Sequence, residues 1–329
     1  MKIVYYKSFP EQRKSWKDYV VFILAHFYVL SLLPYFLLFL RKIVDILKKE
    51  RKKFKYEVSI CMIFKDEARF LNEWLTYYKL LGVNHFYLYN NNSSDNFRSI
   101  LEPYIADGFV TLIDWPKNYA QIEAYEDCWI KTKNETHWLG FLDADEFLNL
   151  QSCDSIAKLL FRYKNYPAVF FNWRIFGTCG HISKEYKLVT EAFTSCWPNL
   201  CHIGKTFINN EFENFKINTH FSTSKVFGFP IFTISEYKIF NPYMCPVFSM
   251  FTGGGKVAYV NHYWSKDYEH YIYKDYVKGD VADITNLQIK KRKGRFEYHE
   301  LQNSSRDYSI QRWLTFIKKV TSDFDKNDY

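Results

Sequence analysis

Two aspartates, Asp143 and Asp145, follow an apolar stretch and form the strongest candidate for catalytic chemistry in this sequence. In an extended chain, residues two positions apart point to the same side. Their carboxylates would repel each other unless a cation lies between them, and oxygen ligands suit hard cations such as Mg²⁺ or Mn²⁺, which also bind substrate phosphates. An acidic turn after a strand is the alternative. A D-x-D that ends a buried strand favours the metal interpretation.

Polar residues also follow two earlier apolar segments. Three of them come directly after residues 58–64, namely Lys65, Asp66 and Glu67. They could face a ligand, or they could cap a helix whose dipole favours acids in the first turn. Three more follow residues 84–89, namely Asn90, Asn92 and Asp95. These could hydrogen-bond a base or ribose, or form an Asx-rich turn.

A third candidate is the stretch VNHYWSK at residues 260–266. His262 lies among apolar residues, where a lone histidine is more often part of the core than a ligand. Lys266 could contact a phosphate or could simply be solvated. The sequence leaves both interpretations open for each residue.

The segments that must position these residues alternate between strand and helix patterns. Apolar runs rich in β-branched and aromatic residues predict strands over 58–64, 84–89, 109–113, 137–142 and 168–172. Helical spacing predicts helices over 67–81, 119–133 and 154–163, and a short helix that ends at Tyr104. The alternation and the short connections indicate an α/β fold with a mostly parallel sheet flanked by helices. Ligands bind such sheets beyond the carboxyl ends of the strands, where the polar candidates lie.

Composition and charge narrow the class of protein. The chain has 329 residues, of which 48% are hydrophobic and 24% charged, so a disordered chain is excluded. The net charge of +8 is concentrated in residues 1–56, which hold 13 Lys or Arg against 4 Asp or Glu. The remainder is balanced, so no nucleic-acid partner is expected. No glycine-rich phosphate loop occurs in the sequence.

The N-terminal segment predicts a membrane anchor. Residues 20–40 contain no charged side chain and would span about 31 Å as a helix, close to the thickness of a bilayer core. Five Lys or Arg precede this run and eight follow it, so we expect a single span with the catalytic domain in the cytoplasm. The basic flank would also contact anionic lipid headgroups. His26, Ser31 and Pro34 interrupt the run, so an in-plane interfacial helix and a buried core helix stay open.

We therefore expect three regions. Residues 1–56 form the membrane-anchor helix with its basic flanks, residues 57–290 the main α/β domain, and residues 291–329 a C-terminal helical tail.

Four ordered motifs carry a resemblance to a known family. They are CMIFKDEARFLNEWLTYYKLLGVNHFYLYNNNSSDN, WLGFLDADEFL, FFNWRIFGTCGH and VNHYWSKDYEHYIYKDYVKGDVAD, and together they cover roughly residues 57–285. The sequence resembles glycosyltransferase family 92 and its bacterial relatives, which are close to the family 2 glycosyltransferases. The resemblance implies a GT-A (Rossmann-like) fold, a nucleotide-sugar donor that we expect to be UDP-linked, a divalent cation (Mn²⁺ or Mg²⁺) and inversion at the anomeric carbon.

The resemblance also implies roles for individual residues. Asp143 and Asp145 would be the D-x-D, and His262 a third metal ligand. Lys266 would approach the diphosphate, and residues 65–67 match the stretch that opens the nucleotide site. Two departures stand out, because Lys266 is followed by Asp267, and a Glu-Arg-Phe triplet of the family reads Glu-Ala-Phe at residues 191–193.

The implied mechanism is direct displacement. The metal and Lys266 neutralise charge on the departing nucleoside diphosphate, and a carboxylate deprotonates a hydroxyl of a glycan or lipid-linked acceptor. Glu191 is the candidate base. Trp173, Lys205 and His220 could line the acceptor side or could be structural.

Two other functions remain as alternatives. A sugar nucleotidyltransferase would share the sheet and the acidic metal site, but it should also have the glycine-rich phosphate loop that this sequence lacks. A non-catalytic, membrane-anchored glycan-binding protein would explain the apolar N-terminal run and the many aromatic residues, but not the D-x-D.

Overall fold

The computed structural model of the protein describes residues 33–47, 52–118, 120–201, 203–213, 215–220, 222–231, 234–235, 238–239, 257–278 and 294–326. The first part of the main domain alternates strands and helices. In chain order these elements are β1 (Tyr56–Phe64), α3 (Ala68–Leu80), β2 (His85–Asn90), α4 (Phe97–Ala106), β3 (Val110–Asp114), α5 (Gln121–Thr132) and β4 (Thr136–Phe141). The four strands pair in parallel in the order β3-β2-β1-β4.

The second part of the main domain brings strands of both directions to the same sheet. Its main elements are β5 (Glu146–Leu150), α6 (Ile156–Phe161), β6 (Ala168–Ile175), α7 (Val189–Ala192), β8 (Gly204–Asn209) and β13 (Ala258–His262). Strand β8 runs antiparallel to β4 on one side and to β6 on the other. Strand β13 pairs in parallel with β6 and antiparallel with β5. The second part is therefore a mixed sheet.

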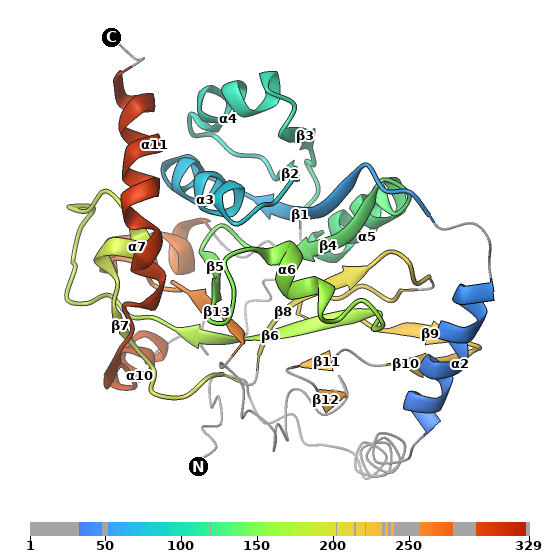
Figure 1. The fold of residues 1–329 in the computed structure, drawn as a ribbon. Coiled ribbons are helices and arrows are strands. Elements are labelled where there is room, and N and C mark those ends of the chain that lie inside the picture. Colours follow the sequence, from blue (N-terminus) through green and yellow to red (C-terminus); the bar gives the residue numbers. More distant parts are fainter. Residues whose placement is uncertain are drawn as a thin grey trace.

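Further elements complete the described chain. They are α2 (Leu33–Leu47), β7 (Ser195–Cys196), β9 (Ser224–Val226), β10 (Phe229–Ile231), β11 (Ile234–Ser235), β12 (Lys238–Ile239), α8 (Tyr268–Ile272), the π-helical turn η2 (Tyr273–Lys278), α10 (Arg295–Leu301), β14 (Ser305–Arg306), the 3-10 helix η3 (Ser309–Trp313) and α11 (Leu314–Lys326). Strands β9 and β10 form a hairpin outside the main sheet. Figure 1 shows α2 beside this hairpin and α11 beside α3.

Helices cover both faces of the sheet, as the side chains of β1 show. Successive residues of a strand point to opposite faces. Val58, Ile60 and Met62 lie in a core that includes residues of α3, α4 and α6. Cys61 and Ile63 lie in a second core that includes residues of α5 and α2. The continuous apolar run of β1 reflects this burial on both faces.

The predicted elements of the first part agree with the observed ones to within a few residues. The α/β fold with a large sheet flanked by helices is confirmed. The expectation of a mostly parallel sheet holds for β1 to β4, but β8 reverses the direction between β4 and β6. A strand that returns by a long connection gives no local signal of its direction, so the sequence pattern could not reveal this reversal.

The predicted anchor lies largely outside the described residues. Residues 33–40 of the apolar run belong to α2, which continues beyond the run to Leu47. Within the described part of the chain, we find no helix whose length and apolar character would let it cross a bilayer. At the other end, the described part of the predicted C-terminal tail is mainly helical, with the two-residue strand β14 between α10 and η3, and Ile310 and Ile317 are buried in the main core. The division at residues 56 and 290 stays a prediction.

Candidate active site

The D-x-D lies in the connection between β4 and β5, at the carboxyl end of a parallel strand. The turn is held by Trp74 of α3, whose indole nitrogen donates to the carbonyl oxygens of Asp143 (3.1 Å) and Glu146 (3.0 Å). The backbone nitrogen of Asp143 donates to the Glu146 carboxylate at 2.9 Å. Because Trp74 is fully buried, the turn is anchored to the core rather than free in solvent.

Asp143 is held on both carboxylate oxygens. Its Oδ2 lies 2.7 Å from Nζ of Lys205 on β8. Its Oδ1 accepts hydrogen bonds from Gln121 Nε2 and Tyr125 OH of α5, both at 3.1 Å. The Asp143 side chain remains 32% exposed, so the carboxylate is fixed in orientation yet reachable from solvent.

Glu146 and Lys205 form a buried ion pair behind Asp143. The two side chains are essentially inaccessible, and Lys205 Nζ lies 3.5 Å from Glu146 Oε2. Burial raises the pKa of Glu146 well above its usual range although Lys205 opposes the shift. Burial also disfavours the charged form of Lys205, but Asp143 and Glu146 outweigh it and raise the pKa of this lysine. Lys205 therefore stays charged inside the protein.

Asp145, the second carboxylate of the motif, is buried and contacts two cationic or basic groups. Its Oδ2 lies 2.5 Å from Nζ of Lys274 in η2, and its Oδ1 lies 3.6 Å from Nε2 of His262. Burial alone would raise the pKa of Asp145, but Lys274 and then His262 hold it well below its usual range. Asp145 is therefore ionised at neutral pH.

His262 reaches Asp145 because of strand register. It ends β13 and pairs with Glu146 of β5 and with Ile175 of β6. Its ring lies 4.2 Å from that of Trp173, and burial lowers its pKa despite the nearby Asp145. Its Nδ1 is buried and has no hydrogen-bond partner among the described residues. A neutral, buried imidazole next to a carboxylate is a chemically competent metal ligand.

Lys266 follows in a bend of the chain after β13. Its side chain is buried, with Nζ 3.3 Å from Glu67 Oε2 and 3.4 Å from His270 Nε2. Its backbone is left-handed (φ +50°), which is uncommon for a residue other than glycine. The bend directs Lys266 toward the start of α3, so the structure brings together two predicted site residues, Lys266 and Glu67.

The polar residues expected at the nucleotide hold the loops at this edge of the sheet. Asp66 Oδ1 accepts from the backbone nitrogen of Ser94 at 2.7 Å, and Asp95 Oδ2 accepts from that of Ala68, also at 2.7 Å. Asn90 donates through Nδ2 to Asp114 at 2.9 Å. Two further predicted residues lie at the same edge, Lys65 half-buried and Asn92 exposed. These bonds join separate loops, whereas Asn90 Oδ1 also accepts locally from the backbone nitrogen of Ser93 at 3.0 Å, as a turn-forming Asn does. Contact with a nucleotide stays a prediction.

The other predicted residues divide into two groups. Trp173 and His220 lie near His262, with their own rings in an edge-on contact at 5.1 Å, and burial lowers the pKa of His220 to about 3. Glu191 lies on α7, where its carboxylate pairs with Lys318 of α11. No described contact joins Glu191 to the D-x-D, and its role as a base stays a prediction.

The fit of a divalent cation can be tested on the donor atoms present. Among the residues that the structure describes, no three His, Cys, Asp or Glu side chains are arranged as a ready metal site. Asp145 Oδ1 and His262 Nε2 are 3.6 Å apart, however, and two ligands of one ion with bonds of about 2.1 Å can be up to about 4.2 Å apart. A carboxylate oxygen and an imidazole nitrogen suit Mn²⁺. The pair fits a cation whose remaining ligands come from a substrate.

Four residues that contact the D-x-D or Lys205 were not singled out by the sequence analysis. They are Glu146, Lys274, Gln121 and Tyr125. Glu146 directly follows the D-x-D, and this acidic neighbour was a usable signal. Lys274 lies 129 residues from Asp145 in the sequence and carries no local signal.

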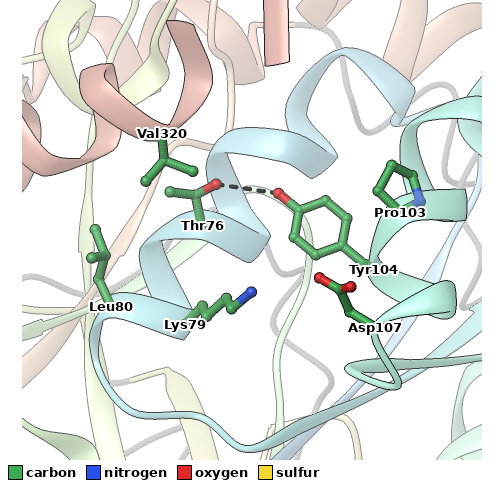
Figure 2. A pocket seen from close by; sticks show the side chains of 7 residues that line it. All are labelled: Thr76, Lys79, Leu80, Pro103, Tyr104, Asp107 and Val320. Carbon is green, nitrogen blue, oxygen red and sulfur yellow. Dashed lines mark hydrogen bonds between the residues drawn. The ribbon is translucent and has the colours of Figure 1, made fainter. Parts of the chain in front are cut away.

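A separate hollow lies away from this cluster, between α3, α4 and α11 (Figure 2). It is lined by Thr76, Lys79, Leu80, Pro103, Tyr104, Asp107 and Val320. Thr76 and Tyr104 hydrogen-bond to each other at 3.3 Å, as the dashed line in Figure 2 marks. None of the charged residues around the D-x-D lines this hollow, so we do not assign the active site there.

Comparison with known proteins points to one family. The model of glycosyltransferase family 92 matches residues 55–244. A family 92 protein of Ricinus communis is 36% identical over 104 residues, which are 31% of this chain and 18% of that protein. One of Oryza sativa subsp. japonica is 27% identical over 150 residues, which are 44% of this chain and 26% of that protein. The matches thus cover only about a fifth to a quarter of these relatives' length.

Solved structures give weaker matches. S. aureus TarS 1-349 is 11% identical, with 47% of each chain covered and a TM-score of 0.33. Glucosyl-3-phosphoglycerate synthase from Mycobacterium tuberculosis, solved in complex with Mn²⁺, uridine-diphosphate-glucose and phosphoglyceric acid, is 12% identical, with 47% of this chain and 57% of that chain covered and a TM-score of 0.30.

Proposed function

This chain belongs to glycosyltransferase family 92, and from that membership we propose that it transfers a sugar from a nucleotide-sugar donor to a hydroxyl group of a glycan or lipid-linked acceptor. We propose a UDP-linked donor, a GT-A type of fold, a divalent cation and inversion at the anomeric carbon. The family match covers more than half of the chain and includes β1 to β4 and the D-x-D.

One observation carries the proposal, namely the gathering of lysines around buried and half-buried carboxylates where β1 and β4 end. Lys205 contacts Asp143, Lys274 contacts Asp145 and Lys266 contacts Glu67. A nucleoside diphosphate gains negative charge as it leaves, and fixed cations in a site of restricted solvent access stabilise that charge. In this proposal, Lys266 and Lys274 offer their ammonium groups to a diphosphate bound at this edge.

Asp145 and His262 are the residues that would hold the cation, with Asp143 alongside. When bound, such a cation neutralises charge on the diphosphate oxygens. Lys274 lies on Asp145 in this structure, so binding of the donor would redirect this lysine from the carboxylate to a phosphate oxygen.

The proposed reaction is a single displacement at the anomeric carbon. The acceptor oxygen forms a bond to this carbon while the bond from the carbon to the diphosphate oxygen breaks, and the electron pair of the broken bond leaves with the diphosphate. A carboxylate takes the proton of the acceptor hydroxyl. Glu191 remains our candidate for this base. Trp173 and His220, beside His262, are candidates for the acceptor side.

The experiment is a donor panel on the purified full-length chain. Nucleotide sugars that differ in base and sugar are incubated with the protein and Mn²⁺, and release of nucleoside diphosphate is measured with and without glycan acceptors. We expect release from at least one donor, and we expect the Asp145→Asn variant to lose it. Release of pyrophosphate from a sugar phosphate and a nucleoside triphosphate, with no diphosphate release, would support a nucleotidyltransferase and overturn the proposal.

A further inference from the structure

Helix α2 is fixed to the main domain by a side that carries buried leucines together with the ion pair of Arg41 and Asp45. Leu37 and Leu38 lie in the same core as Phe212 and Val226. The Arg41 guanidinium lies 4.4 Å from the Phe212 ring centroid. It also donates to the backbone oxygen of residue 211 at 2.6 Å and to the carboxylate of residue 45 at 3.1 Å. The ion pair of this helix therefore lies on the half that faces the protein.

The opposite side of α2 is apolar and exposed. Its exposed hydrophobic residues are Leu33, Tyr35, Phe36, Phe39, Ile43, Val44, Ile46 and Leu47. Phe39 is 58% exposed and Ile46 66% exposed. A surface helix of a soluble protein normally turns its apolar stripe inward and its charges outward. In α2 apolar residues lie on both sides, and the exposed side carries many apolar residues besides Lys42. A contiguous apolar surface of this kind marks an interaction site.

The β9–β10 hairpin extends this apolar surface. Its two-residue turn consists of Phe227 and Gly228, with φ of +50° and +83°. Phe227 is 54% exposed and Phe229 47% exposed. Asn or Asp is the favoured residue at the first position of such a turn, and a bulky side chain with positive φ is strained there. An exposed phenylalanine at this position gains nothing from folding and points to an external contact.

The border of the surface is basic on balance, although Glu211 and Glu213 are also exposed there and Glu213 pairs with Lys52 at 3.3 Å. Lys42 on α2 and Lys225 on β9 are exposed, and Lys52 and Lys53 are exposed shortly after α2. Residues 41–55 hold eight Lys or Arg against two acids. In a symmetric contact with a second copy of the chain, this basic border would meet itself and repel. Anionic lipid headgroups are complementary to it.

We propose that the outer side of α2 and the tip of the β9–β10 hairpin form one in-plane docking surface for an anionic lipid bilayer. Figure 1 shows the two elements side by side at one edge of the molecule. The apolar side chains enter the interfacial layer, and the lysines at the border contact the headgroups. This proposal does not depend on the proposed transferase activity.

The placement of α2 distinguishes this docking from a membrane span. A spanning helix meets lipid around its circumference, whereas α2 keeps Leu37, Leu38 and Arg41 against the protein. The hairpin also takes part in docking, although it lies almost 190 residues further along the chain than α2. A span at residues 20–40 would hold the protein on the membrane whether or not the hairpin touched lipid.

The test is vesicle flotation of the full-length protein. Phosphatidylcholine vesicles with about 30% phosphatidylglycerol are compared with pure phosphatidylcholine vesicles. We expect F227S/F229S, and separately I43S/I46S, to lower the partition coefficient about tenfold or more, because each pair removes apolar area from the interface. K42Q/K225Q should lower only the preference for phosphatidylglycerol. Phe161→Ser is the matched control, because Phe161 is 62% exposed outside the surface and should leave partition unchanged.

Three outcomes would overturn the proposal. Equal partition of wild type and both apolar double variants would mean that another segment holds the protein on the membrane. A lipid-free dimer that the same substitutions dissociate would mean that a second copy covers the surface. Equal loss in Phe161→Ser would mean that the effect is not specific to this surface.

A second measurement needs no variant. Amide hydrogen exchange of the wild-type chain is followed with and without the anionic vesicles. We expect slower exchange in residues 33–47 and 224–231 when vesicles are present, and no change in α6. Unchanged exchange in residues 224–231 would overturn the proposal even if the substituted proteins failed to fold.

Discussion

The two halves of the central sheet use their polar side chains differently. In the half built from β1 to β4, carboxylates and amides at the strand ends mainly accept from or donate to neighbouring loops, as Asp66 and Asp95 do with backbone nitrogens. In the half built from β5, β6, β8 and β13, charged groups are buried and pair with one another, as Lys205 does with Glu146. Asp143 and Asp145 lie at the junction of the two halves.

This difference indicates that the first half fixes the shape of the site, whereas the charged groups of the second half are the ones that would interact with ligands. A hydrogen bond from a carboxylate to a loop nitrogen contributes on the order of 1 kcal/mol and fixes a shape. A buried charge is costly unless it is paired, so a buried group of this kind can change partners only for a ligand that also supplies the opposite charge. We expect substitutions in the first half to affect mainly stability, and substitutions at the junction and in the second half to affect metal binding, donor binding and turnover.

The largest effect should come from Asp145→Asn. The substitution replaces the charged carboxylate with a neutral amide, which then lies beside Lys274 and His262. We expect a loss of turnover on the order of 10³-fold, the upper range for removing one preorganised electrostatic contact in an active site. Donor hydrolysis measures it, with Asp154→Asn as the control because Asp154 is an exposed partner of Lys158. Turnover within a factor of about three of wild type would separate the D-x-D from catalysis.

Lys205→Met should have the next largest effect, on the free energy of unfolding. It leaves Asp143 and Glu146 without their buried cation. We expect a loss of about 3 kcal/mol, the lower end for breaking a buried pair, because the raised pKa of Glu146 allows it to take up a proton. Urea unfolding measures the change. The double variant with Glu146→Gln should recover part of it, and purely additive losses would show that the two groups do not interact.

His262 should affect metal affinity more than stability. If it is a ligand, His262→Ala and His262→Phe should both weaken Mn²⁺ binding about 10- to 100-fold, because the ring nitrogen beside Asp145 is lost in both. If it is a core residue packed on Trp173, His262→Phe should keep activity and only His262→Ala should lower the melting temperature. The apparent Mn²⁺ constant of donor hydrolysis decides between them, with Lys266→Ala expected to weaken the donor more than the metal.

Asp95→Ala should have the smallest effect. It removes the acceptor for the backbone nitrogen of Ala68 at the start of α3, which is worth about 1 kcal/mol of unfolding free energy. Asp107→Ala, at an exposed carboxylate after α4, is the matched control. The other Asp95 oxygen, Oδ1, is buried without a hydrogen-bond partner among the described residues. Weaker donor binding in Asp95→Ala at unchanged fold would show that this oxygen also meets the nucleotide.

The same comparison explains how much the sequence could predict. Strands β1 to β4 and their helices were predictable because periodicity and caps are local signals, and the expected helix over 67–81 matches α3 with Gly82 in a left-handed conformation after it. The grouping of Asp145 with His262 came from a family resemblance. The structure places the two side chains 3.6 Å apart, although whether they bind metal is still a prediction.

What the sequence could not predict depends on long-range register. Lys205 reaches Asp143 only because β8 lies antiparallel between β4 and β6. The six residues of β8 do not indicate either its direction or its register in the sheet. Lys274 reaches Asp145 through a π-helical turn, which has no distinctive residue pattern. The sequence therefore shows these lysines one by one, but it does not show which carboxylates they pair with.

The position of β13 has a consequence for how the protein is made. Strand β13 lies between β5 and β6, although the chain completes β6 at Ile175 and reaches β13 only at Ala258. At a synthesis rate of about 5–20 residues per second, the two earlier strands wait roughly 4–16 s for their partner. During that interval their unpaired edges can attract other chains. Strand β13, which closes these edges, also brings His262 to Asp145, so a newly made chain covers the exposed edges and brings the two candidate metal ligands together in the same step.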